Sequence, residues 1–256
     1  MNDNYNSEFD IIQLKETDST NNFAKRLIEE RRQSGEALSD CTIISADRQT
    51  AGRGRQGKSF ASPGGGCIYM TIVMKADEVP ERCMMITPAA AVGTLLALEE
   101  AGSERLGIKW VNDLFLKEKK VCGILTEAVF AKDGARIEYV VIGIGINIDL
   151  DMAQIPEDVR AVAGTIRRLK LSKQDMVLSI ARHVRSEAEA SISGETGFMS
   201  IYRERSVLTG REVFWEDAGG RHVGKVTDIN DRGNLIVSES GNTVTLMSGE
   251  VSVKKL

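Results

Sequence analysis

The residues best suited to chemistry lie in one short stretch, the loop Gln49–Lys58. Its last seven residues, 52–58, hold three glycines and three cations (Arg53, Arg55 and Lys58) and no apolar residue. Glycine lets the backbone approach a ligand closely, and the planar arginine fork fits phosphate and carboxylate oxygens. Because such a loop has little to bury, it predicts a site that closes over a nucleotide phosphate.

The same loop fits two known nucleotide-binding patterns, G-x-G-x-x-G and G-x-x-x-x-G-K-S. Each pattern needs a strand before it and a helix after it. The run Cys41–Ala46 favours a strand, but Pro63 and the glycines at 64–66 follow the loop, and these residues stop a helix. Both patterns are therefore rejected here, and a solvated basic surface loop is the plainer alternative.

Two further lysines lie in or beside apolar runs. Lys109 stands inside Gly107–Leu116, where a buried lysine must be paired or meet an anion, and Asp113 is a candidate partner. Lys120 is either a solvated hairpin lysine or a ligand contact, since Gly123 beside it would let a ligand approach the backbone.

Two glycines at alternate positions, Gly143 and Gly145, interrupt a strongly apolar strand. Glycine weakens a strand, so this spacing indicates that one face is left bare. Either a helix packs closely there or a flat ligand lies across the sheet.

The remaining polar residues exclude several kinds of catalysis. The chain has two histidines, and neither lies near the basic loop in sequence, which argues against a Ser-His-Asp or Cys-His device. Its four cysteines form no C-x-x-C, and no cluster has zinc-ligand spacing. A cationic site can instead hold a carboxylate against an α-phosphate and neutralise the charge of displacement. ATP would suit, with Mg²⁺ riding on its phosphates and no metal ligands needed from protein side chains alone.

Length and composition set the frame for this site. A chain of 256 residues can hold one sizeable core plus a small module. Its net charge of −4 argues against a general nucleic-acid binder. We expect a cytoplasmic protein with reduced thiols, because no signal peptide is apparent and no apolar run reaches the roughly 18 residues of a membrane helix.

The elements that must position these residues follow from periodicity and from start and stop signals. Strands are predicted at 9–14, 41–46, 67–74, 107–116 (with a polar break), 120–127 and 139–148, with a hairpin tip at 117–119. Helices are predicted after the Ser19 or Thr20 cap, from the Thr87 cap and Pro88 to Gly102, after the Ser172–Asp175 capping box, and over 197–205. From Arg211 onward, short β-rich runs predict a small module of about five strands.

Three separated segments together resemble one family, the biotin protein ligases. They are the 52–57 loop, the run 109–114 with 120–125, and the Gly143-x-Gly145-x-Asn147 strand. Asp18–Asn21 before the first helix agrees, as does the β module that ends in 249–251. The resemblance covers nearly the whole chain, from Asp18 onward.

The resemblance implies an α+β fold: a mixed β-sheet catalytic domain of the class II synthetase type, flanked by helices and followed by an SH3-like β-barrel. We expect the domains to span 1–208 and 209–256. The implied activity is that of a ligase forming carbon–nitrogen bonds. Biotin reacts with ATP to give biotinyl-5′-AMP, and the biotinyl group then passes to a lysine of a biotin carboxyl carrier protein.

The resemblance also assigns roles to residues. Biotin would be bound by Ser19, Thr20, Asn21, Gln49, Arg53, Gly54, Arg55, Lys120, Gly123, Gly143 and Gly145. ATP or the adenylate would be bound by Arg53, Arg55, Lys58, Asn112, Lys120 and Asn147. The catalytic group would be Lys120, Arg53, Lys109 and Asp113, with Asp113 orienting the incoming amine.

The sequence departs from the family pattern at several positions. Val111 stands where proline is usual, and Gln56, Lys58 and Phe60 replace residues that are often Arg, Arg and Trp. Only seventeen residues precede Asp18, too few for the DNA-binding domain of some members, so we expect no DNA binding. Whether the chain forms a homodimer stays open. The alternatives are a lipoate-type acyl ligase and a non-catalytic biotin or nucleotide sensor.

Overall fold

A large mixed sheet forms the centre of the molecule. The computed structural model describes residues 8–60, 66–151, 153, 155, 157–167, 169–217, 219–247, 249 and 251–253. The sheet has seven strands in the order β1-β2-β3-β7-β6-β5-β4. Their bounds are Asp10–Thr17 (β1), Cys41–Gln49 (β2), Cys67–Glu78 (β3), Gly107–Lys109 (β4), Asp113–Leu116 (β5), Lys119–Phe130 (β6) and Ile137–Asn147 (β7).

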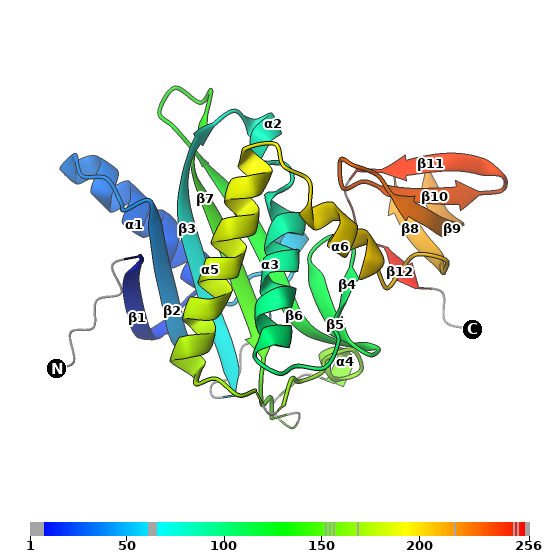
Figure 1. The fold of residues 1–256 in the computed structure, drawn as a ribbon, viewed down its shortest axis with the longest axis horizontal. Coiled ribbons are helices and arrows are strands. Elements are labelled where there is room, and N and C mark those ends of the chain that lie inside the picture. Colours follow the sequence, from blue (N-terminus) through cyan, green and yellow to red (C-terminus); the bar gives the residue numbers. More distant parts are fainter. Residues whose placement is uncertain are drawn as a thin grey trace.

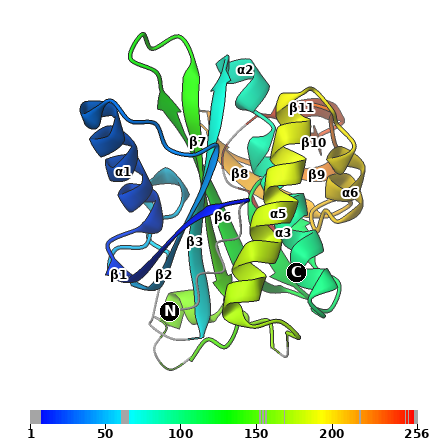
Figure 2. The ribbon, with the colours of Figure 1, turned by 60° about the vertical axis from the view of Figure 1, so that its left-hand side comes forward.

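Helices cover both faces of this sheet. Helices α3 (Ile86–Glu100) and α5 (Lys173–Ile192) lie side by side on one face, and α1 (Thr20–Ser34) lies on the other (Figures 1 and 2). The remaining helices are short: α2 (Pro80–Cys83), the 3₁₀ turn η1 (Arg55–Gly57), α4 (Glu157–Arg160) and α6 (Phe198–Glu204).

Strand β3 shows how the sequence specifies two faces. Side chains on successive residues of a strand point to opposite sides. Ile68, Met70 and Ile72 accordingly belong to the core beneath α3 and α5, whereas Val73 packs under α1. This strand is buried on both faces because helices cover each of them, as its continuous apolar run indicates.

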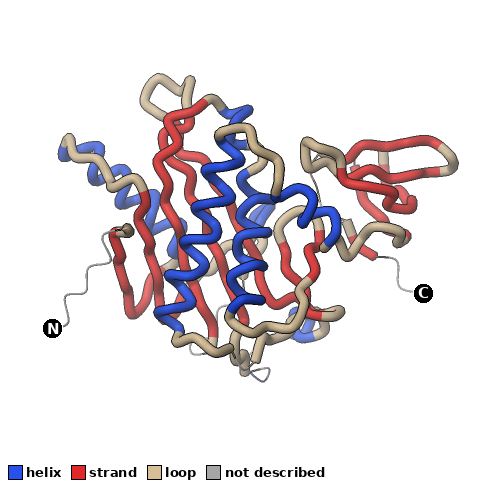
Figure 3. Tube along the Cα trace, in the orientation of Figure 1, coloured by secondary structure: helices blue, strands red, loops and turns tan. Residues whose placement is uncertain are grey.

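A second sheet follows the large domain. Its strands are β8 (Glu212–Asp217), β9 (Gly220–Ile229), β10 (Leu235–Glu239), β11 (Asn242–Leu246) and β12 (Ser252–Val253). Within the described residues they form one antiparallel sheet of five strands in the order β11-β10-β9-β8-β12. In Figure 3 these strands form a separate red group beside α6. The predicted α+β class and the small all-β module are confirmed.

The two sheets are joined by direct hydrogen bonds. The indole of Trp110 donates to the Gly233 carbonyl at 2.8 Å, and Arg203 Nε donates to the Ile229 carbonyl at 2.6 Å. Arg203 also pairs with Asp231. The turn between β9 and β10 is thereby fixed against the β4–β5 turn and α6.

Two predicted element boundaries are wrong. Thr87 is not a helix cap: α3 begins at Ile86 with Met85 at its N-cap, and α2 leads directly into it, so Thr87 and Pro88 lie in the first turn. The polar break in 107–116 is a chain reversal between two strands. The backbone of Lys109 in β4 lies opposite that of Asp113 in β5 in an antiparallel ladder.

The prediction that no apolar segment reaches membrane-spanning length is also wrong. An 18-residue window within the segment Pro80–Glu100 is long and apolar enough by composition to cross a membrane. However, 61% of that window is buried inside the protein. We therefore regard α3 as the core helix of a folded domain.

Close packing of α3 against α5 depends on Gly93. A Cβ placed on Gly93 would lie 2.8 Å from the backbone of His183 and Val184, which cannot move without moving α5. We expect Gly93→Ala to lower the free energy of unfolding by about 1–3 kcal/mol, the usual cost of overpacking. Urea titration checks this, with Gly197→Ala as control because nothing lies within 4 Å of that Cβ. Equal unfolding midpoints for the two variants would show that the helices are not in such close contact.

Candidate functional site

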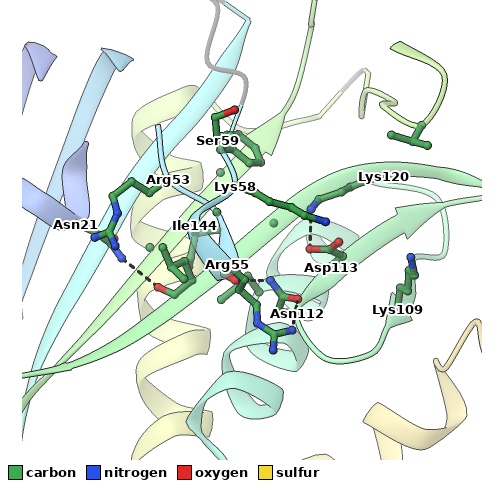
Figure 4. Close-up of a pocket in the computed structure, with 18 of the residues that line it drawn as sticks. Asn21, Arg53, Arg55, Lys58, Ser59, Lys109, Asn112, Asp113, Lys120 and Ile144 are labelled. Atoms are coloured by element: carbon green, nitrogen blue, oxygen red, sulfur yellow. Dashed lines mark hydrogen bonds and ion pairs between the residues drawn. The ribbon is translucent and has the colours of Figure 1, made fainter. Parts of the chain in front are cut away.

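A cavity of about 360 Å³ opens where the loop, the sheet and the small module meet. The start of α1, the basic loop, the β4–β5 turn, β6 and β7 contribute (Figure 4). The end of β2 and the segment that leads into β12 contribute as well. The described lining residues include Ser19, Thr20, Asn21, Gln49, Arg53, Gly54, Arg55, Lys58, Lys109, Asn112, Asp113, Lys120, Gly123, Gly143 and Gly145. Of the predicted site residues, Asn147 alone is missing from this described lining.

The two strand glycines form a floor of the cavity that has no side chains of its own. A Cβ placed on Gly143 would lie 2.8 Å from Asn21 Cγ and closer still to Oδ1. A Cβ placed on Gly145 would lie 2.6 Å from the Phe60 ring. The first alternative holds in part, because a residue at the start of α1 packs closely on Gly143, while the Phe60 ring from the loop covers Gly145. The flat ligand stays a prediction.

One end of the cavity is lined by neutral polar groups. Gln49 Oε1 accepts from the Thr20 amide at 2.9 Å and from its hydroxyl at 3.1 Å. Ser19 holds the N-cap position as predicted, but in the described chain its hydroxyl forms no capping bond. Gln49 thus accepts a bond from a free backbone amide in the first turn of α1, as a capping side chain usually does. The same bond fixes strand β2 to α1.

Asn21 is held by a network rather than by packing alone. Thr71 Oγ1 donates to Asn21 Oδ1 at 2.7 Å. Asn21 Nδ2 donates to the Leu125 carbonyl at 3.1 Å and to Glu127 Oε2 at 2.9 Å. With three directed bonds on one buried amide, this side chain has little freedom to move.

The other end of the cavity is cationic. Lys120 Nζ lies 2.7 Å from Asp113 Oδ1, and both side chains are about a quarter exposed. Lys109, for which Asp113 was the predicted partner, has its ammonium 5.9 Å from the centre of the Phe115 ring. Arg55 Nη1 donates to Asn112 Oδ1 at 3.3 Å. Figure 4 shows these groups facing the cavity from the loop and the hairpin.

The loop folds back on itself and, in the part that the structure describes, does not lead into a helix, which is why the two nucleotide-binding patterns do not apply. Arg53 and Ser59 form an antiparallel bridge, and the Phe60 amide donates to the Gly52 carbonyl at 2.8 Å. Only the short turn Arg55–Gly57 is helical, with a left-handed residue inside it. As far as Phe60 no helix longer than this turn follows the loop, so the helix N-terminus that the two rejected patterns require is not found in this described part of the chain; Pro63, Gly64 and Gly65 lie outside the described residues.

Asn147 holds a segment of the chain that forms part of the cavity wall. Its side-chain amide donates to the Gly164 carbonyl at 3.0 Å, and the Ile166 amide donates to the Asn147 carbonyl at 2.8 Å. The segment that Asn147 holds brings Val162 to the cavity wall. In the described residues Asn147 thus positions part of the cavity wall, and its direct contact with ATP stays a prediction.

Sequence reasoning missed several residues of the site. Phe60 was noted only as a departure, Gly249 and Val251 only as the end of the β module, and Val162 and Ser252 were not named. Glu127, which accepts bonds from Asn21 and Arg53, was also missed. The signal that could have indicated Glu127 is its position, since it is an acidic residue at the end of an apolar strand run.

Comparison with known proteins gives the following matches. The Biotin/lipoate A/B protein ligase family matches residues 14–147, and the Biotin protein ligase C terminal domain matches residues 209–254. A biotin–(acetyl-CoA-carboxylase) ligase of Mycobacterium tuberculosis is 31% identical over 224 residues, which are 83% of this chain and 79% of that protein. The bifunctional ligase/repressor BirA of Bacillus subtilis is 27% identical over 217 residues, 83% of this chain and 66% of its own length. The chain thus spans about two thirds of that longer relative.

Solved structures give the same result. A biotin protein ligase from Aquifex aeolicus in complex with biotin and ATP matches with a TM-score of 0.77 and 25% identity. The match covers 96% of this chain and 99% of that one. The similarity therefore includes both sheets.

Proposed function

Because the chain belongs to the biotin/lipoate A/B protein ligase family, we propose that it is a biotin protein ligase. The observation that carries this is one cavity with a neutral polar end and a cationic end. The similar Aquifex aeolicus ligase is bound to biotin and ATP, which supports the same two small molecules as substrates here.

The neutral end suits the ring system of biotin. Ser19, Thr20 and Asn21 are buried, and their amide and hydroxyl groups can satisfy a neutral ureido group without a charge. Gly143 and Gly145 add no side chain to the cavity wall, so a flat ring would lie against the strand beside Asn21 and Phe60, which already approach these two glycines. The biotin carboxylate then points toward Lys120.

The cationic end suits the first chemical step. The carboxylate oxygen attacks the α-phosphate of ATP, a P–O bond forms, and pyrophosphate leaves. Lys120 draws both anions together, and Arg55 neutralises charge that grows on the phosphoryl oxygens. Such a site works by holding and neutralising the reactants, so it needs no strong base.

The second step transfers the acyl group. A lysine amine of a biotin carboxyl carrier protein attacks the acyl carbonyl of biotinyl-5′-AMP, loses a proton, and AMP leaves. Asp113 is the carboxylate in the cavity that can orient this amine, because it already binds the ammonium of Lys120 at 2.7 Å. The boundary between the catalytic domain and the small module lies at residues 208 and 209 in this proposal.

Magnesium enters with the nucleotide. Among the described residues no group of three or more His, Cys, Asp or Glu side chains could hold a metal ion. We treat Mg²⁺ as part of the MgATP substrate, carried on the phosphates of the nucleotide.

The experiment that tests this function is pyrophosphate release. Purified protein with MgATP should release pyrophosphate only when biotin is added, and should then label a carrier protein on one lysine. Absence of biotin-dependent release would favour the sensor alternative and contradict the proposal.

A lipoate-type ligase is the second candidate, since the matching family includes lipoate ligases. The match of residues 209–254 to the Biotin protein ligase C terminal domain favours biotin. Isothermal titration with each acid separates the two, and tight binding of lipoate without binding of biotin would reverse our assignment.

Arg53→Gly is expected to release the adenylate early. Arg53 is the first cation of the loop and lies at the cavity edge beside Asn21 (Figure 4). Loss of one charge-assisted contact predicts roughly tenfold faster dissociation of biotinyl-5′-AMP. Labelling of bystander lysines on an unrelated protein measures this. Wild-type selectivity in the variant would show that the loop is not a lid.

A further inference from the structure

Strand β6 carries a carboxylate, Glu127, that binds both a residue of the loop and a residue at the start of α1 that lines the cavity. Arg53 Nη1 donates to its two oxygens at 2.9 and 3.2 Å. Asn21 Nδ2 donates to Glu127 Oε2 at 2.9 Å, and Lys25 Nζ donates to Oε1 at 2.9 Å. Donors from α1 and from the loop therefore converge on one side chain.

The contact with Arg53 ties the loop to β6, in addition to the bonds that the Thr50 and Ala51 amides donate to the Thr17 and Asp18 carbonyls at 2.9 Å each. Arg53 Nη1 also donates to Asn22 Oδ1 on α1 at 3.0 Å. Between them, Glu127 and Asn22 fix the guanidinium beside the buried Asn21. Arg53 is thereby held at the cavity edge, on the side away from Lys120 and Lys109 (Figure 4).

The environment of Glu127 keeps it ionised. Its side chain is only 20% exposed, and burial by itself would raise its pKa. The hydrogen bonds from Lys25 and Asn21, together with the charges of Lys25 and Arg53, outweigh burial and lower the pKa of this carboxyl. Lys25 and Arg53 share the charge of one carboxylate. Lys25 would therefore still neutralise Glu127 if Arg53 turned toward the phosphate of a bound ligand.

We propose that Glu127 is a positioning residue that anchors the Gln49–Lys58 loop to β6 through Arg53, and so sets how long the adenylate is retained. Glu127 is not among the described lining residues of the cavity, so it acts through Arg53. The claim about adenylate retention rests on the proposed function. The claim that Glu127 anchors the loop does not depend on that function.

A purely structural role for Glu127 makes a different prediction. In that case the carboxylate would serve to hold α1 on the sheet through Lys25 and Asn21. Replacing Lys25 would then have the same effect as replacing Glu127, and both changes would act on overall stability and not on the loop.

The test compares Glu127→Gln with the matched control Lys25→Met, which removes the other cation and leaves Arg53 its partner. Trypsin cleaves after arginine and lysine, so Arg55 and Lys58 report directly on loop exposure in the protein without ligand. We expect cleavage at these two sites, followed by mass spectrometry, to be roughly tenfold faster in Glu127→Gln, as for loss of one charged hydrogen bond. Lys25→Met should stay close to wild type.

Adenylate retention is measured in the same proteins. Dissociation of preformed biotinyl-5′-AMP should also be roughly tenfold faster in Glu127→Gln. Adding Glu127→Gln to Arg53→Gln should change little, because the pair forms one contact. If Glu127→Gln does not fold, Asn22→Ala, which removes the second acceptor of Arg53, should raise cleavage about two- to threefold.

The outcomes separate the two claims. Wild-type cleavage rates in Glu127→Gln, or equal effects of Lys25→Met, would overturn the anchoring role. Failure of the wild-type protein to form an adenylate would overturn the proposed function, while the proteolysis result would still decide whether Glu127 anchors the loop.

Discussion

Replacing Lys120 with alanine is expected to reduce the rate of biotinyl-5′-AMP formation by orders of magnitude while the fold is retained. Loss of one partner from a charge-assisted pair costs about 2–5 kcal/mol, which is roughly 30- to 5000-fold in rate. Lys120 lies on the cavity wall with its ammonium at Asp113, where the biotin carboxylate and the α-phosphate would meet. Its removal leaves two anions without the cation that draws them together.

Rapid-quench assays with labelled ATP measure this rate, and thermal unfolding checks the fold. Lys117→Ala is the matched control, because Lys117 sits at the nearby hairpin tip with a side chain 75% exposed. The control should adenylate biotin at the wild-type rate. A Lys120→Ala enzyme within a factor of about three of wild type, under 1 kcal/mol, would remove Lys120 from the chemistry.

Gly143→Ala is expected to weaken biotin binding by roughly a hundredfold, or about 2.7 kcal/mol. The added methyl would lie 2.8 Å from Asn21 Cγ. Asn21 cannot yield easily, because its amide bonds to Thr71, Leu125 and Glu127 at 2.7, 3.1 and 2.9 Å. The variant must either break part of this network or lose the bare floor on which a ring can lie.

Isothermal titration with biotin measures the loss, and a second variant shows its cause. If the clash with Asn21 is responsible, Gly143→Ala in an Asn21→Ala background should cost little more than Asn21→Ala alone. Fully additive losses would mean that Gly143 acts on binding independently of Asn21.

The sequence was most informative where chemistry is local. The Ser172–Asp175 capping box is confirmed, since the Ser172 hydroxyl accepts from the Asp175 amide at 3.1 Å. The loop residues Arg53, Gly54, Arg55 and Lys58 and the strand residues Gly143 and Gly145 also line one cavity, as their residue types predicted. The resemblance to biotin protein ligases is confirmed by the family match.

Features that depend on distant partners could not be predicted. The turn at 110–112 has no glycine or proline; it is fixed by Trp110 on Gly233 and by the Tyr202 hydroxyl on the Val111 carbonyl at 2.9 Å. The link between Arg53 and Glu127 spans 74 residues, and nothing in either local sequence indicates it. The misplaced start of α3 has a simpler cause, because Thr87-Pro88 is a valid start signal that the preceding α2 overrides.

Native mass spectrometry of the protein after incubation with biotin and MgATP tests the central claim most directly. If Arg53, Lys109 and Lys120 serve one cavity that forms an acyl phosphate, the protein should gain the mass of biotinyl-5′-AMP. That species should disappear when a carrier protein is added. A protein that gains only the mass of ATP or of biotin, with no adenylate, would contradict the claim.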